Sequence, residues 1–152
     1  MSAETDDWPI LVISLGIATE RRAVIASQLA SMNLTCQFID AVDGRKGLGP
    51  EWDTAIDRQG AVARYGYPMS DGEFACSLSH QLAYARVLDE GLPGAIVLED
   101  DAILTPDFAA FYRQRQFRTA DFIQFFCFAA RIWRGPGRRS VSQVRLHRLA
   151  EN

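Results

Sequence analysis

Three consecutive carboxylates, Glu99, Asp100 and Asp101, are the part of this sequence with the clearest chemical potential. They follow an apolar run over residues 95–98, which is preceded by Pro93-Gly94 and lacks the alternation of a half-exposed strand. The run therefore predicts a short buried strand whose carboxyl end carries the acids. In open α/β sheets this edge is where ligands bind.

Side chains alternate across an extended strand, so Glu99 and Asp101 are expected on one side and Asp100 on the other. Two carboxylates on one side supply hard oxygen ligands for Mg²⁺ or Mn²⁺, and such an ion can also hold a diphosphate. The alternative is a solvated acidic turn before a helix that starts near Thr105-Pro106-Asp107. From the residues alone, a metal site and an acidic turn are both open interpretations.

The size and composition of the chain fit one globular domain over residues 1–152. Of its 152 residues 48% are hydrophobic, which is enough for a sizeable core. The acidic start, residues 1–7, lacks the basic and apolar regions of a secretory signal. No apolar run approaches the roughly 20 residues that span a bilayer. We therefore expect a cytoplasmic protein.

The cysteines Cys36, Cys76 and Cys127 lie far apart in the sequence. Their odd number argues against a disulfide framework, and none has the CxxC or Cys/His spacing of a zinc site. Each is expected to be a buried thiol.

Charge is distributed unevenly along the chain, although the net charge is only −3. From Phe111 onward nine arginines stand against two acidic residues. Such a segment can contact phosphate or an anionic membrane surface, or it can form a solvated face opposite the acidic half. The basic residues are not interleaved with a recognisable nucleic-acid-binding motif, so no nucleic-acid partner is expected.

The first part of the chain has the pattern of a βαβ unit. Residues 10–15 predict a strand, residues 20–32 an amphipathic helix with Thr19 as its N-cap, and residues 35–39 a second strand. The two strands should lie parallel. Only Gly16 occupies the first turn, so the GxGxxG fingerprint of NAD or FAD binding is absent.

The clearest helix is predicted over residues 71–88, with Ser70 or Asp71 as its cap, and it leads into the acidic strand. His80 lies in the middle of this helix and is either a structural or a catalytic residue. The loop over residues 40–50 contains Asp40 and Asp43, which can form Asx turns beside Gly44. Further elements are expected over residues 52–59 and 106–118 (helices) and over residues 122–128 and 141–149 (strands).

Four blocks of the sequence together resemble glycosyltransferase family 25, which includes bacterial lipooligosaccharide galactosyltransferases. They occur in order over roughly residues 10–110, and a lone Glu-Asp-Asp would be far less specific. The blocks are the strand Val12–Leu15 with Glu20-Arg21-Arg22, the strand end Phe38–Gly44, the helix start Gly72–His80, and the acidic strand Ile96–Asp101.

The resemblance implies a GT-A-like, Rossmann-type α/β fold with a mostly parallel sheet flanked by helices. It also implies a UDP-sugar donor, with UDP-galactose expected, and a divalent metal, Mn²⁺ or Mg²⁺. The acceptor would be a lipooligosaccharide or another glycan, and transfer would invert the anomeric carbon. The expected location is cytoplasmic, with possible contact of the Arg-rich segment with the inner membrane.

By the same resemblance, residues of these blocks receive roles in donor and metal binding. Asp101 is assigned to the metal, Glu99 to the metal or the donor, and Asp100 to support of the donor. Arg22 is expected to face the uracil or diphosphate, and Asp43 the nucleoside. The other residues assigned to the donor site, for which packing roles stay open, are Ser14, Glu73, Ser79 and His80.

Family members typically continue well beyond this length with residues that contact the acceptor and a carboxylate base for its hydroxyl. We therefore expect this chain to be a truncated, donor-binding half, with no catalytic base that can be assigned. The alternative is a non-catalytic protein that binds a nucleotide sugar, or that associates with another chain through residues 122–128 and the basic C-terminal segment.

Overall fold

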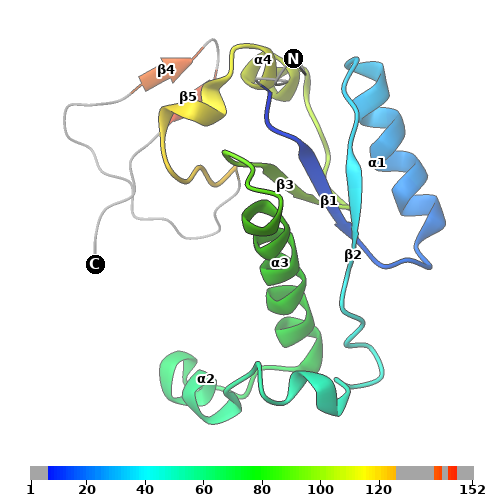
Figure 1. Cartoon of the computed structure of the whole chain (residues 1–152), viewed down its shortest axis with the longest axis vertical. Helices are drawn as coiled ribbons and strands as arrows, with labels where there is room; N and C mark the ends of the chain where they lie inside the picture. The colour runs from blue at the N-terminus through cyan, green and yellow to red at the C-terminus, as the bar shows by residue number, and fades with distance from the viewer. Residues whose placement is uncertain (1–6, 126–138, 142–143, 147–152) are drawn as a thin grey trace.

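The computed structural model describes residues 7–125, 139–141 and 144–146, and at its centre lies a parallel three-stranded sheet (Figure 1). The strand order is β2-β1-β3, with β1 at Ile10–Ser14, β2 at Gln37–Asp40 and β3 at Ile96–Glu99. Helices flank this sheet, so the expected α/β class and the parallel pairing of β1 with β2 are confirmed. Both neighbours of β1 run parallel to it, which brings three carboxyl ends to one edge.

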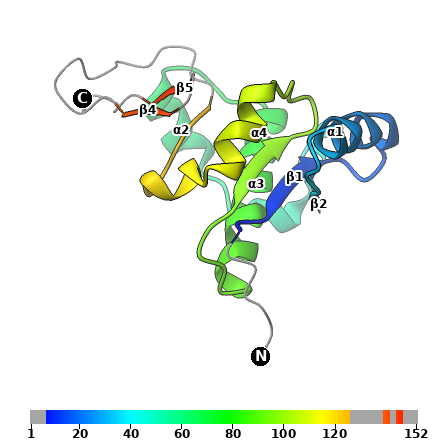
Figure 2. The ribbon, with the colours of Figure 1, turned by 90° about the horizontal axis from the view of Figure 1, so that it is seen from above.

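Strand β1 is buried along its whole length because helices cover both faces of the sheet. Ile10 and Val12 face a core that includes α1 (Thr19–Ser31) and α4 (Pro106–Arg113). Leu11 and Ile13 face a second core that includes α3, Asp71–Asp89. Figure 2 shows α1 and α3 on opposite sides of the sheet. Alternation along one central strand thus assigns each helix to its face.

The register of the sheet aligns the polar ends of its three strands. Ser14 pairs with Asp40 of β2, and Ile13 pairs with Glu99 of β3. The chain leaves β2 and β3 at the same edge at which it leaves β1. Residues of three separate blocks of the sequence therefore meet there.

The helix α1 begins one residue earlier than expected, and Thr19 is not its N-cap. Ala18 occupies that position without a side-chain hydrogen bond. Strand β2 begins at Gln37 instead of residue 35.

The region between β2 and α3 also differs from the prediction, because local caps decide where its helix forms. A 3₁₀ turn covers Pro50–Trp52, and the helix α2 spans Arg58–Tyr65 in place of residues 52–59. The Asp57 carboxylate accepts a hydrogen bond from the Gly60 amide at the start of α2. Gly66 ends the helix in the left-handed conformation with φ 78°.

The helix expected over residues 106–118 is shorter in the structure. It ends at Arg113, Arg115 takes a left-handed conformation with φ 53°, and a 3₁₀ turn follows over Gln116–Thr119. This break turns Phe117 into the core, where only 3% of its surface is exposed. Burial of an aromatic side chain therefore overrides continuation of the helix.

The C-terminal elements differ as well. Residues 122–125 form no strand, and the rest of the predicted strand to residue 128 lies outside the described residues. Instead of one strand over 141–149, short strands β4 (Arg139–Val141) and β5 (Val144–Leu146) pair antiparallel. Among the helices of the described residues, none combines the length and apolar character needed to cross a membrane.

Candidate functional site

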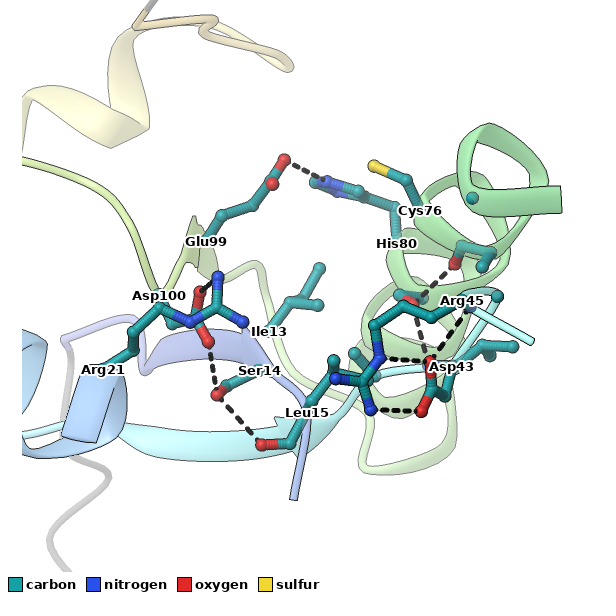
Figure 3. A pocket seen from close by; sticks show the side chains of 16 residues that line it. Ile13, Ser14, Leu15, Arg21, Asp43, Arg45, Cys76, His80, Glu99 and Asp100 are labelled. Carbon is teal, nitrogen blue, oxygen red and sulfur yellow. Dashed lines mark hydrogen bonds and ion pairs between the residues drawn. The ribbon is translucent and has the colours of Figure 1, made fainter. Parts of the chain in front are cut away.

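A pocket of about 240 Å³ opens at the carboxyl edge of the sheet (Figure 3). Its walls come from the ends of β1 and β3, the loop after β2, the first three turns of α3 and Arg21 of α1. It lies where open α/β sheets bind their ligands. Of the residues predicted from sequence to bind the donor or metal, Ser14, Asp43, Ser79, His80, Glu99 and Asp100 line this pocket.

Asp100 is held inside the fold and is only 7% exposed. The Ser14 hydroxyl donates a hydrogen bond to its Oδ2 at 2.6 Å, and Arg21 Nη1 lies 3.2 Å from its Oδ1. A buried carboxylate is costly unless it is paired and hydrogen-bonded, and these contacts satisfy both oxygens. Asp100 therefore ties the ends of β1, β3 and α1 together at the edge of the pocket.

Glu99 projects to the other face of the sheet, toward α3. Its Oε1 lies 3.2 Å from Nε2 of His80, and both side chains reach the pocket (Figure 3). Asp101 is exposed and lies near enough to Cys76 for its charge to raise the pKa of that thiol. The expected division, with Glu99 and Asp101 on one side and Asp100 on the other, is thus confirmed although residues 100–101 form a turn.

Asp101 borders a second, larger hollow of about 1110 Å³ that lies along β3 and α3. Glu99 and His80 line both hollows and so stand at their junction. Within the part of the chain that the structure describes, the Asp101 carboxylate has no hydrogen-bond or ion-pair partner. Its oxygens are therefore available to a ligand.

Cys76 is exposed, which corrects the expectation of a buried thiol, and Cys36 is only half-buried. Cys127 lies outside the described residues. Partial burial, followed by the charges of Glu99 and Asp101, raises the pKa of the Cys76 thiol. The thiol is therefore protonated at neutral pH and is not poised as a free nucleophile.

Ser79 supports the wall of the pocket from α3. Its hydroxyl donates to the Ala75 carbonyl at 2.6 Å and accepts from the Val42 amide at 2.9 Å. These bonds attach the loop after β2 to the helix. Gly44 of the same loop lies so close to α3 that an added Cβ would stand 2.5 Å from the Asp71 carbonyl oxygen. Only glycine fits at this approach.

Arg22 is engaged at the strand ends and does not line the pocket, whereas Arg21 does. The Arg22 guanidinium donates to the Ser14 carbonyl at 2.8 Å, pairs with Asp40, and covers the Phe38 ring. The neighbouring Arg21 is a pocket cation that the sequence prediction missed, as it also missed Arg45. Both arginines belong to the same Glu-Arg-Arg block. They differ in the direction in which their side chains leave α1, and only that of Arg21 reaches the pocket.

Asp43 and Arg45 form a paired rim of the pocket. Arg45 Nε and Nη2 donate to the two oxygens of Asp43 at 2.8 and 2.7 Å. The Arg45 amide donates to Oδ1 at 3.1 Å, so Asp43 also forms the Asx turn considered from sequence. The side-chain bond from Arg45 lowers the pKa of Asp43 to about 2.

The low pKa of Asp43 predicts a pH-dependent contribution to stability. Because the folded state favours the ionised carboxylate, this contribution is present above the unfolded pKa of about 3.9 and is lost as pH falls toward about 2. We expect wild type to be more stable than Asp43→Asn at neutral pH by a small margin, since the pair is exposed. Urea unfolding of both proteins should show that the difference between their free energies of unfolding becomes smaller as the pH falls through this window. A margin that is constant or grows would contradict the assignment.

Glu73 lies outside the pocket and caps α3. Its carboxylate accepts from the Ser70 amide at 2.7 Å, while the Ser70 hydroxyl accepts from the Glu73 amide at 3.3 Å. This capping box lowers the pKa of Glu73. The structure thus gives Glu73 a helix-capping role, and its donor-binding role stays a prediction.

The fold and the pocket define the class of the protein. It is an α/β protein with charged side chains beyond the carboxyl ends of its parallel strands, which is where open α/β sheets bind their ligands. The particular family follows from sequence comparison. The model of glycosyltransferase family 25 (LPS biosynthesis protein) matches residues 7–134. The chain therefore belongs to glycosyltransferase family 25, as its four blocks predicted.

Relatives in this family include bacterial and animal proteins. Lacto-N-neotetraose biosynthesis glycosyltransferase LgtE of Neisseria gonorrhoeae is 38% identical over 93 residues, which are 61% of this chain and 32% of LgtE. LgtB of the same organism is 37% identical over an equal length, again 61% of this chain and 32% of the relative. The inactive glycosyltransferase 25 family member 3 of Mus musculus is 35% identical over 106 residues, 65% of this chain and 17% of that protein. The matched part spans about a third of the bacterial relatives.

Proposed function

We propose that this chain binds a UDP-sugar at the carboxyl edge of its sheet and serves the transfer of a hexose, galactose in the first instance, to a glycan. The observation that carries the proposal is the meeting of all four family blocks in one pocket. Glu99, Arg21 and the Asp43-Arg45 pair reach that pocket from three different segments. The family description, LPS biosynthesis protein, supports a lipooligosaccharide-type acceptor, and the names of LgtE and LgtB, lacto-N-neotetraose biosynthesis glycosyltransferases, support a glycan product. Inversion at the anomeric carbon belongs to the same proposal.

The residues present fit a divalent cation, Mn²⁺ or Mg²⁺, held by Glu99 and Asp101. Both carboxylates are exposed and lie toward α3, whereas Asp100 is occupied by Ser14 and Arg21. Two carboxylates leave other positions of a hard cation to water and diphosphate oxygens. When bound, such an ion supplies electrostatic stabilisation of the charge that develops on the leaving diphosphate.

The arginines of the rim are the protein's own groups for the diphosphate. The side chains of Arg21 and Arg45 are 53% and 58% exposed, so both retain donors that face solvent. A guanidinium offers bidentate hydrogen bonds to phosphate. Arg21 is anchored through Asp100 and Arg45 through Asp43, which limits the entropy lost when a ligand binds.

The Arg-rich segment from Phe111 onward is proposed to contact an anionic membrane surface during transfer to a lipid-linked acceptor. A cytoplasmic location, peripheral to the inner membrane, is part of the same proposal.

Thermal unfolding with and without nucleotide tests the donor proposal. UDP and UDP-galactose are expected to raise the Tm, and Mn²⁺ to increase that shift; a ligand at 100 times its Kd stabilises a protein by about 2.7 kcal/mol. The Mn²⁺-dependent part should vanish in Asp101→Asn and persist in Asp89→Asn, a matched change at an exposed acid at the end of α3. Absence of stabilisation by any UDP ligand would overturn the proposal. An equal response of the two variants would overturn the role of Asp101.

A second candidate function is non-catalytic association with another polypeptide, a second copy included. The described part of the larger hollow leaves large apolar side chains exposed, with Ile103 at 88% and Phe122 at 70%. One relative is named inactive, which is compatible with a binding role. Size-exclusion chromatography with light scattering tests self-association. A chain that stays monomeric at every concentration would contradict association with a second copy.

A further inference from the structure

Three side chains of different chemistry converge at the junction of the two hollows. A ligand atom from each of Cys76, His80 and Glu99 lies within 4.8 Å of the other two. Figure 3 shows Cys76 and His80 extending from α3 toward Glu99 at the end of β3. The set therefore consists of a sulfur, an imidazole nitrogen and a carboxylate oxygen on two rigid elements.

The backbone explains why the three meet. Cys76 and His80 are four residues apart, so they lie on successive turns of one face of α3. Glu99 reaches that face because it follows Val97, whose side chain packs in the core beneath α3. The His80 ring already faces the Glu99 carboxylate at 3.2 Å.

The chemistry of the set differs from that of Glu99 and Asp101 alone. Sulfur and imidazole are ligands that select thiophilic transition metals, whereas Mg²⁺ and Mn²⁺ favour oxygen. Zinc bonds of about 2.0–2.3 Å place tetrahedral ligand atoms roughly 3–4 Å apart. The observed spacing is therefore a small side-chain adjustment away from coordination.

The site is also accessible. Cys76 and Glu99 are exposed and His80 is half-buried, and all three line the 240 Å³ pocket. Three protein ligands leave the fourth tetrahedral position open, which is typical of zinc sites that bind water or substrate.

We propose that Cys76, His80 and Glu99 bind a thiophilic divalent ion, Zn²⁺ or its spectroscopic substitute Co²⁺, with the fourth position open to the pocket. On binding, the thiol proton is released to solvent and the sulfur coordinates as thiolate. The inference deepens the proposed function because it shares Glu99, but the ion requires no nucleotide. The set of Cys76, His80 and Glu99 is distinct from the Glu99–Asp101 pair proposed for Mn²⁺ or Mg²⁺, with which it shares only Glu99.

Titration of the reduced, tag-free chain with Co²⁺, without nucleotide, tests the proposal. We expect thiolate-to-cobalt charge-transfer absorption that Zn²⁺ abolishes by competition. The three cysteines provide a matched set: the absorption should disappear in Cys76→Ser and remain in Cys36→Ser and Cys127→Ser. His80→Gln should weaken Co²⁺ binding by at least about tenfold, the lower end of what even outer-shell partners cost. Circular dichroism establishes that each variant is folded.

Absence of the absorption in the folded wild-type chain would overturn the inference. Its persistence in Cys76→Ser, or its loss in Cys36→Ser or Cys127→Ser, would do so as well. Asp101→Asn separates this inference from the proposed function. That variant should keep the cobalt spectrum and lose the Mn²⁺-dependent part of UDP stabilisation. If UDP fails to bind while the cobalt spectrum is present in wild type, the donor proposal falls and the metal site stands.

Discussion

Replacing Asp100 by alanine is expected to destabilise the protein by about 1–3 kcal/mol, the cost of depriving a buried hydrogen-bonding group of its main partner. The group concerned is the hydroxyl of Ser14, a residue only 2% exposed, which donates to Asp100 at 2.6 Å and whose other acceptor, the Leu15 carbonyl, is farther away at 3.3 Å. The Arg21 pair adds little to this figure, because more than half of that side chain is in solvent. Urea denaturation at neutral pH measures the change.

The adjacent acid provides the matched control for this prediction. Asp101 is exposed and has no partner among the described residues, so Asp101→Ala should leave the free energy of unfolding within about 0.5 kcal/mol of wild type. The effects on nucleotide binding should be ranked the other way. Asp101→Ala should lose the Mn²⁺-dependent part of the stabilisation by UDP, although it barely changes the free energy of unfolding. If both alanine variants destabilise equally, Asp100 does not hold the strand ends together as the structure indicates.

Replacing Phe117 by alanine is expected to cost about 3–5 kcal/mol, the range for a buried phenylalanine. The Phe117 ring packs against Trp8 at a centroid distance of 4.9 Å and against Tyr112 at 5.5 Å. It also belongs to the core that contains Ile96 and Leu98 of β3. Its loss would leave a cavity beneath the acidic strand end, because close-packed cores relax only partially.

Denaturation of Phe117→Ala and Phe122→Ala compares two phenylalanines that lie close in the sequence. Phe122 is 70% exposed, so its truncation should change stability by less than about 0.5 kcal/mol. A small effect at Phe117 would mean that the left-handed turn at Arg115 does not serve to bury this ring.

The three acids that end β3 have separate duties in this structure. Asp100 faces α1 and is satisfied by protein groups, and Glu99 faces α3 and His80. Asp101 borders the larger hollow and has no hydrogen-bond or ion-pair partner among the described residues. One residue of displacement along an extended chain reverses the face on which a side chain lies. A run of identical charges therefore contains one structural position and two positions that remain open to ligands.

Strong local patterns were sufficient to predict the parallel α/β fold, the strand with its acidic end and the capped helix α3. Continuous apolar runs indicate buried strands, and Ser70 with Glu73 marks a helix start through hydrogen bonds within four residues. The family blocks could also be identified from the sequence, because each lies within a short stretch of it. The alternation that divides Asp100 from Glu99 follows from strand geometry alone.

Contacts between distant segments were decided only by the tertiary structure. The packing of α1 directs Arg21, and not Arg22, to the pocket; the burial of Phe117 breaks the predicted helix after Arg113. The Glu99 carboxylate lies close to Cys76 and His80 only because β3 packs beside α3. No CxxC-type spacing in the sequence predicts this contact. Side-chain partners across a sheet depend on register and helix docking, which short-range sequence patterns do not specify.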